Sequence, residues 1–369
     1  MFLKVLKGDE ELALRGRKVV KGSSKDHIFV FFADHGAPGL IAFPRSELTA
    51  RELNKALVSM SKSKGYKKMA IYIEACESGS MFEGLLPSNI NIFATTAAND
   101  VESSYACYWD DERGTYLGDL YSVSWMEDSD LHKSLSTETL AQQFRKVRRE
   151  TNTSHVMEYG DLSIGTLPLS QFQGSKIRNE NETDLINGLM ENISGINLEE
   201  GEINLEKMEI DQERINLEKR MKDAIPSHDV PLVSLKRRAQ LAQDPIKREK
   251  LIREYNYMSE GRRFLKHSMI GLASSLVGHV DTITAPSMSS ESLISSKKPL
   301  TRHECYDELR RTFDSHCFDL STHPYALRFL YILVNVCESS HESEQSLIQE
   351  TILHHCTRHT KGHPFTRIH

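Results

Sequence analysis

The stretch HIFVFFADHG at residues 27–36 runs an apolar strand directly into a histidine, and MAIYIEACESGS at residues 69–80 does the same with a cysteine. Continuous apolar runs of this length are typical of strands buried on both faces, as in a parallel sheet covered by helices. Open α/β sheets carry their chemistry just beyond the carboxyl ends of such strands. A histidine and a cysteine delivered there are the parts of a thiol nucleophile and its base. The two stretches therefore predict a cysteine hydrolase.

The segments around these stretches alternate between strand and helix patterns. Thr49 and Glu52 form a capping-box pattern, and the apolar residues that follow recur at helical spacing. Other elements are predicted farther along: strands at residues 91–96 and 155–160, and a helix around residues 140–147. Such alternation is typical of βαβ units. We therefore expect residues 1–175 to form an α/β domain, a mostly parallel sheet flanked by helices.

The composition is that of a globular protein, with 39% hydrophobic and 27% charged residues among 369. The 46 basic and 52 acidic residues give a net charge of −6, and residues 176–225 alone hold 13 acids and 7 bases, which is also −6. The remainder is near neutral, so no basic surface argues for a nucleic-acid partner. No stretch approaches the roughly 20 apolar residues of a membrane span. Charged residues interrupt the apolar residues at the start of the chain, so this segment does not resemble a signal peptide.

The rest of the chain is predicted to have three parts. Residues 176–231 are an acidic insert or linker with three copies of an Ile-Asn-Leu-Glu tetrapeptide, too few to sustain a coiled coil, so a solvated tether is favoured. Its end, from Pro226 to Pro231, predicts a hinge. Residues 232–281 are a basic helical segment. Residues 282–369 begin with a Ser/Thr/Pro-rich linker and form a small helical module.

The cysteines are unevenly distributed. Four of the six lie within the last 65 residues: the full set is Cys76, Cys107, Cys305, Cys317, Cys337 and Cys356. Four clustered cysteines in a small module suggest two disulfides, and the residues alone leave three pairings open. Cys107 has no evident partner and is expected to be a buried free thiol.

Histidines close to Cys356 offer a rival site. His355 and His359 are four residues apart, a spacing that can chelate zinc on a helix. The group lacks a second cysteine pair with zinc-finger spacing, and a disulfide at Cys356 would remove that ligand. We therefore expect no metal and no cofactor.

Cys76 is the candidate nucleophile and His35 the candidate base. A neighbouring imidazole supplies the thiolate by ion pairing or proton abstraction. Gly36 lets the backbone approach a substrate closely, and its N–H and that of Cys76 can face an oxyanion. Taken alone, a cysteine that ends a buried strand is most often an inert small hydrophobe, and a histidine before glycine is often a loop residue. Their joint placement favours catalysis.

Longer motifs surround these residues. They are Asp34-His35-Gly36, Glu74-Ala75-Cys76-Glu77-Ser78-Gly79-Ser80-Met81, Ala94–Asn99, Glu102–Cys107, Tyr116–Asp119, Trp125–Asp130 and Thr151–Met157. Together they resemble the legumains, the asparaginyl endopeptidases of the caspase-like superfamily. The resemblance covers nearly all of residues 1–175 and returns at residues 305–338. It implies a caspase-like sheet followed by a helical, disulfide-containing prodomain. The related transamidase subunits that attach lipid anchors share the dyad but lack the four-cysteine tail.

The resemblance implies an endopeptidase that cuts after Asn, and after Asp at acid pH. By family match, Glu74, Ser104 and Asp119 line the pocket for that side chain. A carboxamide offers a donor and an acceptor, so carboxylates in the pocket can accept its N–H groups. An Asp substrate would be repelled until protonation removes the charge. The resemblance also implies that Asp34 can cyclise to a succinimide, which is linked to peptide ligation by transpeptidation.

The C-terminal part resembles the legumain prodomain, which covers the active site at neutral pH and is released by acid autocleavage. This resemblance implies the disulfides Cys305–Cys337 and Cys317–Cys356. Acid release is expected because interface carboxylates that pair across the cleft lose charge as they protonate. The implied partners are protein and peptide substrates, the chain's own prodomain as an intramolecular inhibitor, and cystatin-type inhibitors. The implied location is lysosomal or vacuolar, or secreted.

The start of the chain departs from the family pattern. The family's first strand carries an asparagine that orients the catalytic histidine, together with an arginine and a histidine of the specificity pocket, and none has a counterpart here. We expect this to expose apolar surface on the neighbouring strand. A second hypothesis therefore stays open: a truncated, inactive paralogue that acts as a binding or inhibitory protein.

Overall fold

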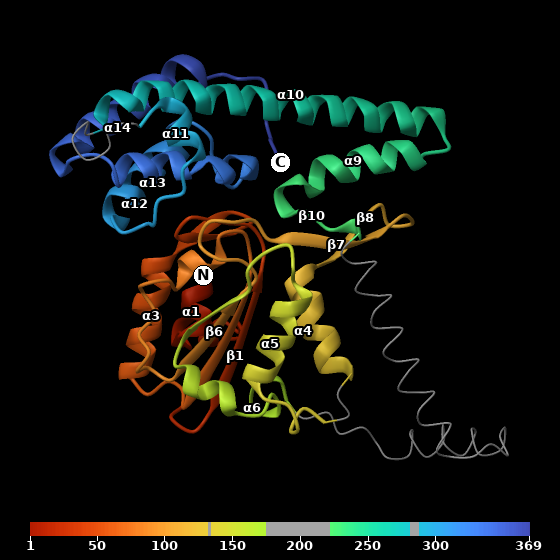
Figure 1. Cartoon of the computed structure of the whole chain (residues 1–369), viewed down its shortest axis with the longest axis vertical. Coiled ribbons are helices and arrows are strands. Elements are labelled where there is room, and N and C mark those ends of the chain that lie inside the picture. The colour runs from red at the N-terminus through yellow and green to blue at the C-terminus, as the bar shows by residue number, and fades with distance from the viewer. Residues whose placement is uncertain (132–133, 175–221, 281–287) are drawn as a thin grey trace.

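The computed structural model describes residues 1–131, 134–174, 222–280 and 288–369. The tetrapeptide repeats and most of the acidic insert lie outside these ranges. An α/β unit comes first, and a helical unit follows it. Figure 1 shows the helical unit lying across one end of the sheet.

The main sheet has the strand order β1-β5-β6-β9 among the described strands. Its strands are β1 (His27–Ala33), β5 (Lys68–Glu74), β6 (Ile92–Thr96) and β9 (Met157–Gly160). The first three are parallel and β9 is antiparallel. All residues of β5 after Lys68, and all of β6, are buried, as the continuous apolar runs predict. The predicted mostly parallel α/β sheet is confirmed.

Helices cover both faces of this sheet (Figure 1). On one face lies α3 (Ala50–Lys62), which begins at Thr49 with the predicted capping box and packs on Ile71 and Ile73. The other face packs Tyr72 and Phe93 under two helices. These are α4 (Leu120–Leu131) and α5 (Leu140–Glu150). Alternate residues of β5 thus contact opposite helical layers, because successive strand side chains point to opposite faces.

Three short helices complete the α/β unit. They are α1 (Phe2–Leu6), α2 (Glu10–Leu14) and α6 (Ser170–Gln173). Leu6 of α1 is buried in the same core as α3. The outer strand β1 has a described neighbour on one side only, and its Phe31 remains 36% exposed while its ring meets Trp125 edge-on. The Phe31 ring is therefore a partly exposed apolar group on β1.

Two small antiparallel sheets lie beyond the carboxyl end of the main sheet. One contains β2 (Gly36–Ala37), β3 (Leu40–Phe43) and β4 (Ser46–Thr49). The other has the order β10-β7-β8 and contains β7 (Tyr105–Asp110), β8 (Thr115–Asp119) and β10 (Ile225–Pro226). The second sheet joins segments that are far apart in the chain. Two short 3-10 turns, η1 (Ser78–Met81) and η2 (Leu162–Thr166), complete this unit.

The helical unit begins with a short turn, η3 (Ser227–Asp229), and a long helical hairpin, α9 (Val230–Leu241) and α10 (Pro245–Leu276). It continues through η4 (Val277–His279), α11 (Ser290–Ser295), α12 (His303–His316), η5 (Pro324–Phe329), α13 (Tyr331–Cys337), η6 (Glu342–Glu344) and α14 (Gln345–His359). Disulfides join Cys305 to Cys337 and Cys317 to Cys356, the pairs that the resemblance implies. They tie α12 to α13 and to α14.

Two parts of the C-terminal half differ from the sequence prediction. The segment from Pro226 to Pro231 is not a hinge: it pairs with β7, turns through η3 and enters α9. The predicted linker around residues 282–299 contains α11, whose Leu293 is fully buried in the helical core. Tertiary burial therefore orders segments that local composition predicted to be connections.

Candidate active site

The ends of β1 and β5 bring Gly36 and Cys76 together. Ala33 pairs with Glu74 in parallel register, so both chains leave the sheet at the same level. A Cβ on Gly36 would lie 2.1 Å from the Cys76 carbonyl oxygen. No side chain fits at that distance, so glycine is required for the two strand ends to meet.

The Cys76 thiol lies among polar side chains. Its Sγ is 3.3 Å from Ser103 Oγ, 3.6 Å from Ser104 Oγ and 3.6 Å from His228 Nδ1. Burial, and secondarily the charge of Glu77, raise the pKa of this thiol to about 12 despite the serine hydrogen bonds. The thiol is therefore protonated at neutral pH, and a protonated thiol is a poor nucleophile.

Glu77, directly after the thiol, has a strained backbone. Its φ of 50° lies in the left-handed region, which is uncommon for a residue other than glycine and recurs at functional sites. The side chain is buried, and this burial raises its pKa to about 8 although Lys297 and Arg328 of the helical unit oppose the shift. The helical unit thus contributes charges directly beside the candidate nucleophile.

His35 follows the end of β1 and is half-buried. Burial lowers its pKa, and the neighbouring Asp34 carboxylate opposes that shift. A neutral imidazole can accept a proton, as a base requires. Among the described residues, however, the imidazole within hydrogen-bonding distance of Cys76 Sγ is that of His228, which comes from the helical unit.

A cavity of about 360 Å³ opens beside His35. Residues of the α/β unit and of the helical unit share its wall: Ala33, Asp34, His35, Glu74, Ser104, Ala106, Tyr116, Leu117, Gly118, Asp119, Ser227, Val230 and Pro231. Glu74, Ser104 and Asp119, which belong to three different segments of the sequence, therefore meet at one cavity next to the candidate base.

Glu74 has one paired and one unpaired oxygen. Its Oε2 accepts hydrogen bonds from the Ser122 amide at 2.7 Å and the Ser122 hydroxyl at 2.8 Å. Its Oε1 is buried and has no hydrogen-bond partner among the described residues. Burial and the charge of Asp119 hold the Glu74 pKa well above its ordinary value. Burial and the charge of Asp34 raise the pKa of Asp119 to about 6.

The cleft is occupied by residues 225–229 of the same chain. β10 pairs antiparallel with Tyr105 and Ala106, and the Ser227 amide donates to the Ser104 carbonyl at 3.0 Å. The hydroxyls of Ser227 and Ser104 are 2.9 Å apart. This is strand addition, the way in which an extended peptide binds to a sheet edge. The C-terminal half therefore occupies the cleft beside the candidate nucleophile.

Four residues at this site were missed from the sequence: Ser103, Ser122, Ser227 and His228. Ser103 lies within a motif that carries the resemblance, so its position could have suggested a role. Ser122 is an ordinary residue in the first turn of α4. Ser227 and His228 carry no sequence signal, because their contacts join residues up to 152 positions apart.

The histidine cluster in α14 has other partners. His355 Nε2 lies 3.0 Å from the Ser268 carbonyl oxygen, and Cys356 is bonded to Cys317. In the part of the chain that the structure describes, no group of three or more His, Cys, Asp or Glu side chains is arranged to hold a metal ion. No described helix combines the length and apolar character of a membrane span.

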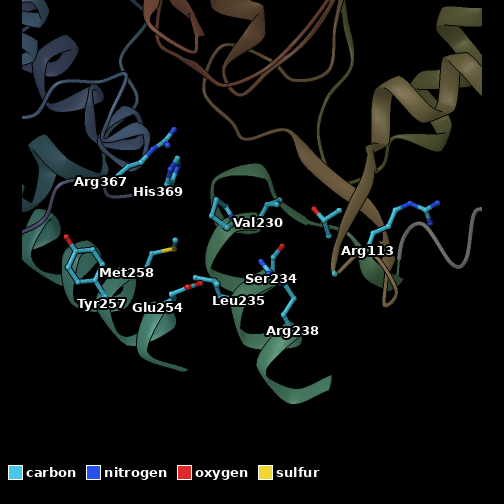
Figure 2. A pocket seen from close by; sticks show the side chains of 13 residues that line it. Arg113, Val230, Ser234, Leu235, Arg238, Glu254, Tyr257, Met258, Arg367 and His369 are labelled. Carbon is cyan, nitrogen blue, oxygen red and sulfur yellow. The ribbon is translucent and has the colours of Figure 1, made fainter. Parts of the chain in front are cut away.

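A second cavity of about 580 Å³ lies outside the cleft, between the β7–β8 hairpin, α9, α10 and the last residues of the chain (Figure 2). Arg113 and Arg238 line it from the hairpin side and from α9, and Glu254 and Met258 from α10. None of the predicted site residues contributes to it. We therefore assign the chemistry to the cleft beside His35.

Comparison with known proteins identifies two matching families. The peptidase C13 family model matches residues 1–175. The legumain prodomain model matches residues 253–356.

Individual relatives extend across both regions. Legumain of Mus musculus is 42% identical over 343 residues, which cover 92% of this chain and 69% of that protein. A hemoglobinase of Schistosoma japonicum is 36% identical over 344 residues, 93% of this chain and 70% of that protein. The vacuolar-processing enzyme delta-isozyme of Arabidopsis thaliana is 34% identical over 365 residues, 94% and 70% respectively.

Proposed function

This chain belongs to the peptidase C13, or legumain, family of cysteine peptidases, and on that premise we propose that it cuts peptide bonds after Asn, and after Asp at acid pH. The observation that carries the proposal is the unpaired Oε1 of Glu74 in the cavity that Ser104 and Asp119 share. A buried carboxyl oxygen without a hydrogen-bond partner is costly, and an Asn carboxamide supplies that partner: its N–H₂ donates to an ionised Oε1, and its carbonyl oxygen accepts from a protonated one.

The proposed reaction uses the thiol and imidazole at the two strand ends. His35 takes the Sγ proton as Cys76 Sγ attacks the carbonyl carbon, and the Gly36 and Cys76 amides stabilise the oxyanion. When the C–N bond breaks, His35 returns the proton to the leaving amine. Water then hydrolyses the thioester, with His35 as the base. The close approach of Gly36 to Cys76 supports this assignment.

We further propose that the described form is the inhibited zymogen. Residues 225–229 fill the cleft, and the high pKa of the Cys76 thiol keeps it protonated there. Neither condition favours attack on a substrate. Removal of the helical unit from the cleft would expose the thiol to water and to His35, which lowers the cost of forming the thiolate.

Other activities follow from the same family premise. Peptide ligation, with Asp34 as the succinimide-forming residue, is supported by the His35 amide, which donates to Asp34 Oδ1 at 2.7 Å and so holds nitrogen and carboxyl close together. Cystatin-type inhibitors are proposed as partners besides protein and peptide substrates. A lysosomal or vacuolar location is proposed in line with the relative named a vacuolar-processing enzyme.

The alternative of an inactive binding or inhibitory protein is not favoured. Both the peptidase and the prodomain models match, and the chain retains the histidine and cysteine that the family chemistry needs.

Hydrolysis of a fluorogenic peptide that ends in Asn tests the proposal. The full chain is incubated at acid pH and compared with its Cys76→Ala variant. We expect turnover by the natural chain and none by the variant. Equal background turnover in both would contradict the proposed activity, and preference for a basic or apolar residue over Asn would contradict the proposed specificity.

A further inference from the structure

His228 stands out among the residues that the helical unit places in the cleft. Its Nδ1 lies 3.6 Å from Cys76 Sγ, and its own carbonyl oxygen accepts a hydrogen bond from Arg262 of α10. The preceding residue, Ser227, is bound to Ser104 through both backbone and side chain. The backbone on both sides of the imidazole is therefore held in place while the segment is docked.

The charges that face this imidazole are mostly positive. Arg328 of η5 is the strongest charged neighbour, and His35 and Arg262 add to it. Asp229 is the one acid that offsets them, and Arg262 at 2.9 Å and Arg328 at 3.9 Å already pair with it. A proton added to His228 would therefore enter a half-buried site between cations.

We propose that His228 is the acid sensor of this zymogen: a neutral His228 holds residues 225–229 against Cys76, and its protonation expels the segment from the cleft. The inference rests on the proposed function, since it assigns the trigger for opening the proposed active site. It concerns a histidine of the inhibitory segment, whereas acid release was expected from interface carboxylates.

Linkage gives the direction of the effect. Burial and the arginines lower the His228 pKa from its ordinary 6.5 to about 4 when the segment is docked. Docking therefore expels a proton from this residue, so its contribution to docking is complete above pH 6.5 and is lost as the pH falls toward 4. Between pH 7.5 and pH 4.5 this residue alone weakens docking by roughly 100-fold.

Interface carboxylates are the other groups that could respond to acid. Burial raises the pKa of Glu77 to about 8, while Lys297 and Arg328 of the helical unit act to lower it. Burial also raises the pKa of Glu47, and its partner Arg310 of α12 acts to lower it. Burial and the cations of the helical unit thus oppose each other at these carboxyls, whereas the shift at His228 has the sign that acid release requires. Acid release through the carboxylates stays a prediction.

Amide hydrogen exchange in residues 225–229 tests the inference. The full chain is used with Cys76→Ser, which prevents autocleavage, and exchange is followed from pH 7.5 to 4.5 with intrinsic rates taken from an unstructured peptide of the same sequence. We expect the protection of this segment to fall on acidification. His228→Gln, which cannot gain the charge, should retain roughly 100-fold more protection at pH 4.5.

His267→Gln is the matched control, because His267 is an exposed histidine on α10. It should follow the unsubstituted chain. If His228→Gln loses protection in parallel with that chain, the inference is wrong. If His228→Gln is unprotected even at pH 7.5, His228→Asn is measured, and lack of protection there too would overturn the sensor role. Hydrogen exchange requires no catalysis. A lack of activity in the Asn-peptide assay would therefore contradict the proposed function, while the exchange result could still be interpreted.

Discussion

Glu74 and Asp119 line one cavity, but Glu74 is buried more deeply than Asp119. Glu74 is fully enclosed and receives two hydrogen bonds from Ser122, but burial and the neighbouring Asp119 still hold its pKa well above the ordinary value. Asp119 is less enclosed, and its pKa of about 6 leaves it mostly ionised at pH 7. The Asp119 carboxylate therefore loses its charge in mild acid.

Glu74→Leu tests the unpaired oxygen. The substitution keeps a similar volume but removes both carboxyl oxygens, so the substrate carboxamide loses its partner whichever protonation state Glu74 has. We expect kcat/KM for Asn substrates to fall by roughly 10- to 100-fold, the cost of one lost buried hydrogen bond. Initial rates of the acid-activated enzyme measure this. Glu83→Gln, away from the cavity lining, is the control, and equal kcat/KM in both variants would remove Glu74 from the pocket.

The pKa of Asp119 predicts a pH-dependent choice of substrate. The shift is upward, so the carboxyl protonates as the pH falls through about 6. Below that pH the repulsion of an Asp substrate weakens, and the ratio of Asp to Asn cleavage should rise. Asp119→Asn should flatten this ratio between pH 7 and 5. Parallel kcat/KM profiles for two peptides that differ only in Asn or Asp measure it, and an unchanged slope in the variant speaks against the assignment.

At the scale of elements, Arg237 of α9 contacts two aromatic rings of the β7–β8 hairpin. The Arg237 guanidinium stacks over Trp109 at 5.0 Å and Tyr116 at 5.4 Å from the ring centroids. It also lies 3.5 Å from Asp223, just before β10. Because Asp223 precedes the segment that enters the cleft and α9 follows it, this contact stabilises the blocked state from outside the site.

Arg237→Ala should loosen that attachment. Loss of the cation–π contact and the partly exposed ion pair is expected to cost about 1 kcal/mol, which is roughly a fivefold increase in local opening. Amide hydrogen exchange of residues 225–241 at pH 7 measures it. Lys236→Ala removes an adjacent, exposed charge and is the control. Identical exchange in the two variants would show that Arg237 does not hold α9.

At the scale of the whole molecule, the two units share a core. Ala37 and Leu40 of the α/β unit pack in the same cluster as the helices α12 and α13. A buried ion pair crosses the same boundary: Arg310 Nη1 of α12 lies 3.3 Å from Glu47 Oε2 of β4. Their side chains are only 8% and 13% exposed. Both groups have lost most of their hydration, so each depends on the other.

Breaking this pair on one side should be costly. Glu47→Ala leaves the Arg310 guanidinium buried with Asp307 at 4.0 Å as its remaining acid, and we expect a loss of about 3 kcal/mol. The double variant Glu47→Leu/Arg310→Met should recover most of that loss. Thermal unfolding of the full chain in the Cys76→Ser background measures both.

The exposed pair of Arg51 and Glu304 spans the same boundary and serves as the control. Arg51→Ala should change stability by less than about 1 kcal/mol. A Glu47→Ala loss as small as that of Arg51→Ala, or a double variant as unstable as the single one, would contradict the assigned role of the buried pair.

The sequence by itself determined the sheet and the two strand ends. A buried strand is recognisable because its continuous apolar run is visible in the local sequence. The residue that follows such a run lies at the carboxyl end of the strand, whatever packs around it. The capping box of Thr49 and Glu52 is equally local and formed as predicted. His35, Gly36 and Cys76 could therefore be named in advance, as could Glu74 at the last position of its strand.

The tertiary structure alone decided what faces the thiol. Ser122 binds Glu74, and His228 lies beside Cys76, because α4 and residues 225–229 dock on the sheet through surfaces distributed over the chain. The sequence pattern around a single polar side chain does not indicate its partner. A contact between residues 152 positions apart depends on how the two segments are placed against each other in the folded chain. For the same reason Pro226–Pro231 resembled a hinge in sequence and is a strand and turn in the folded chain.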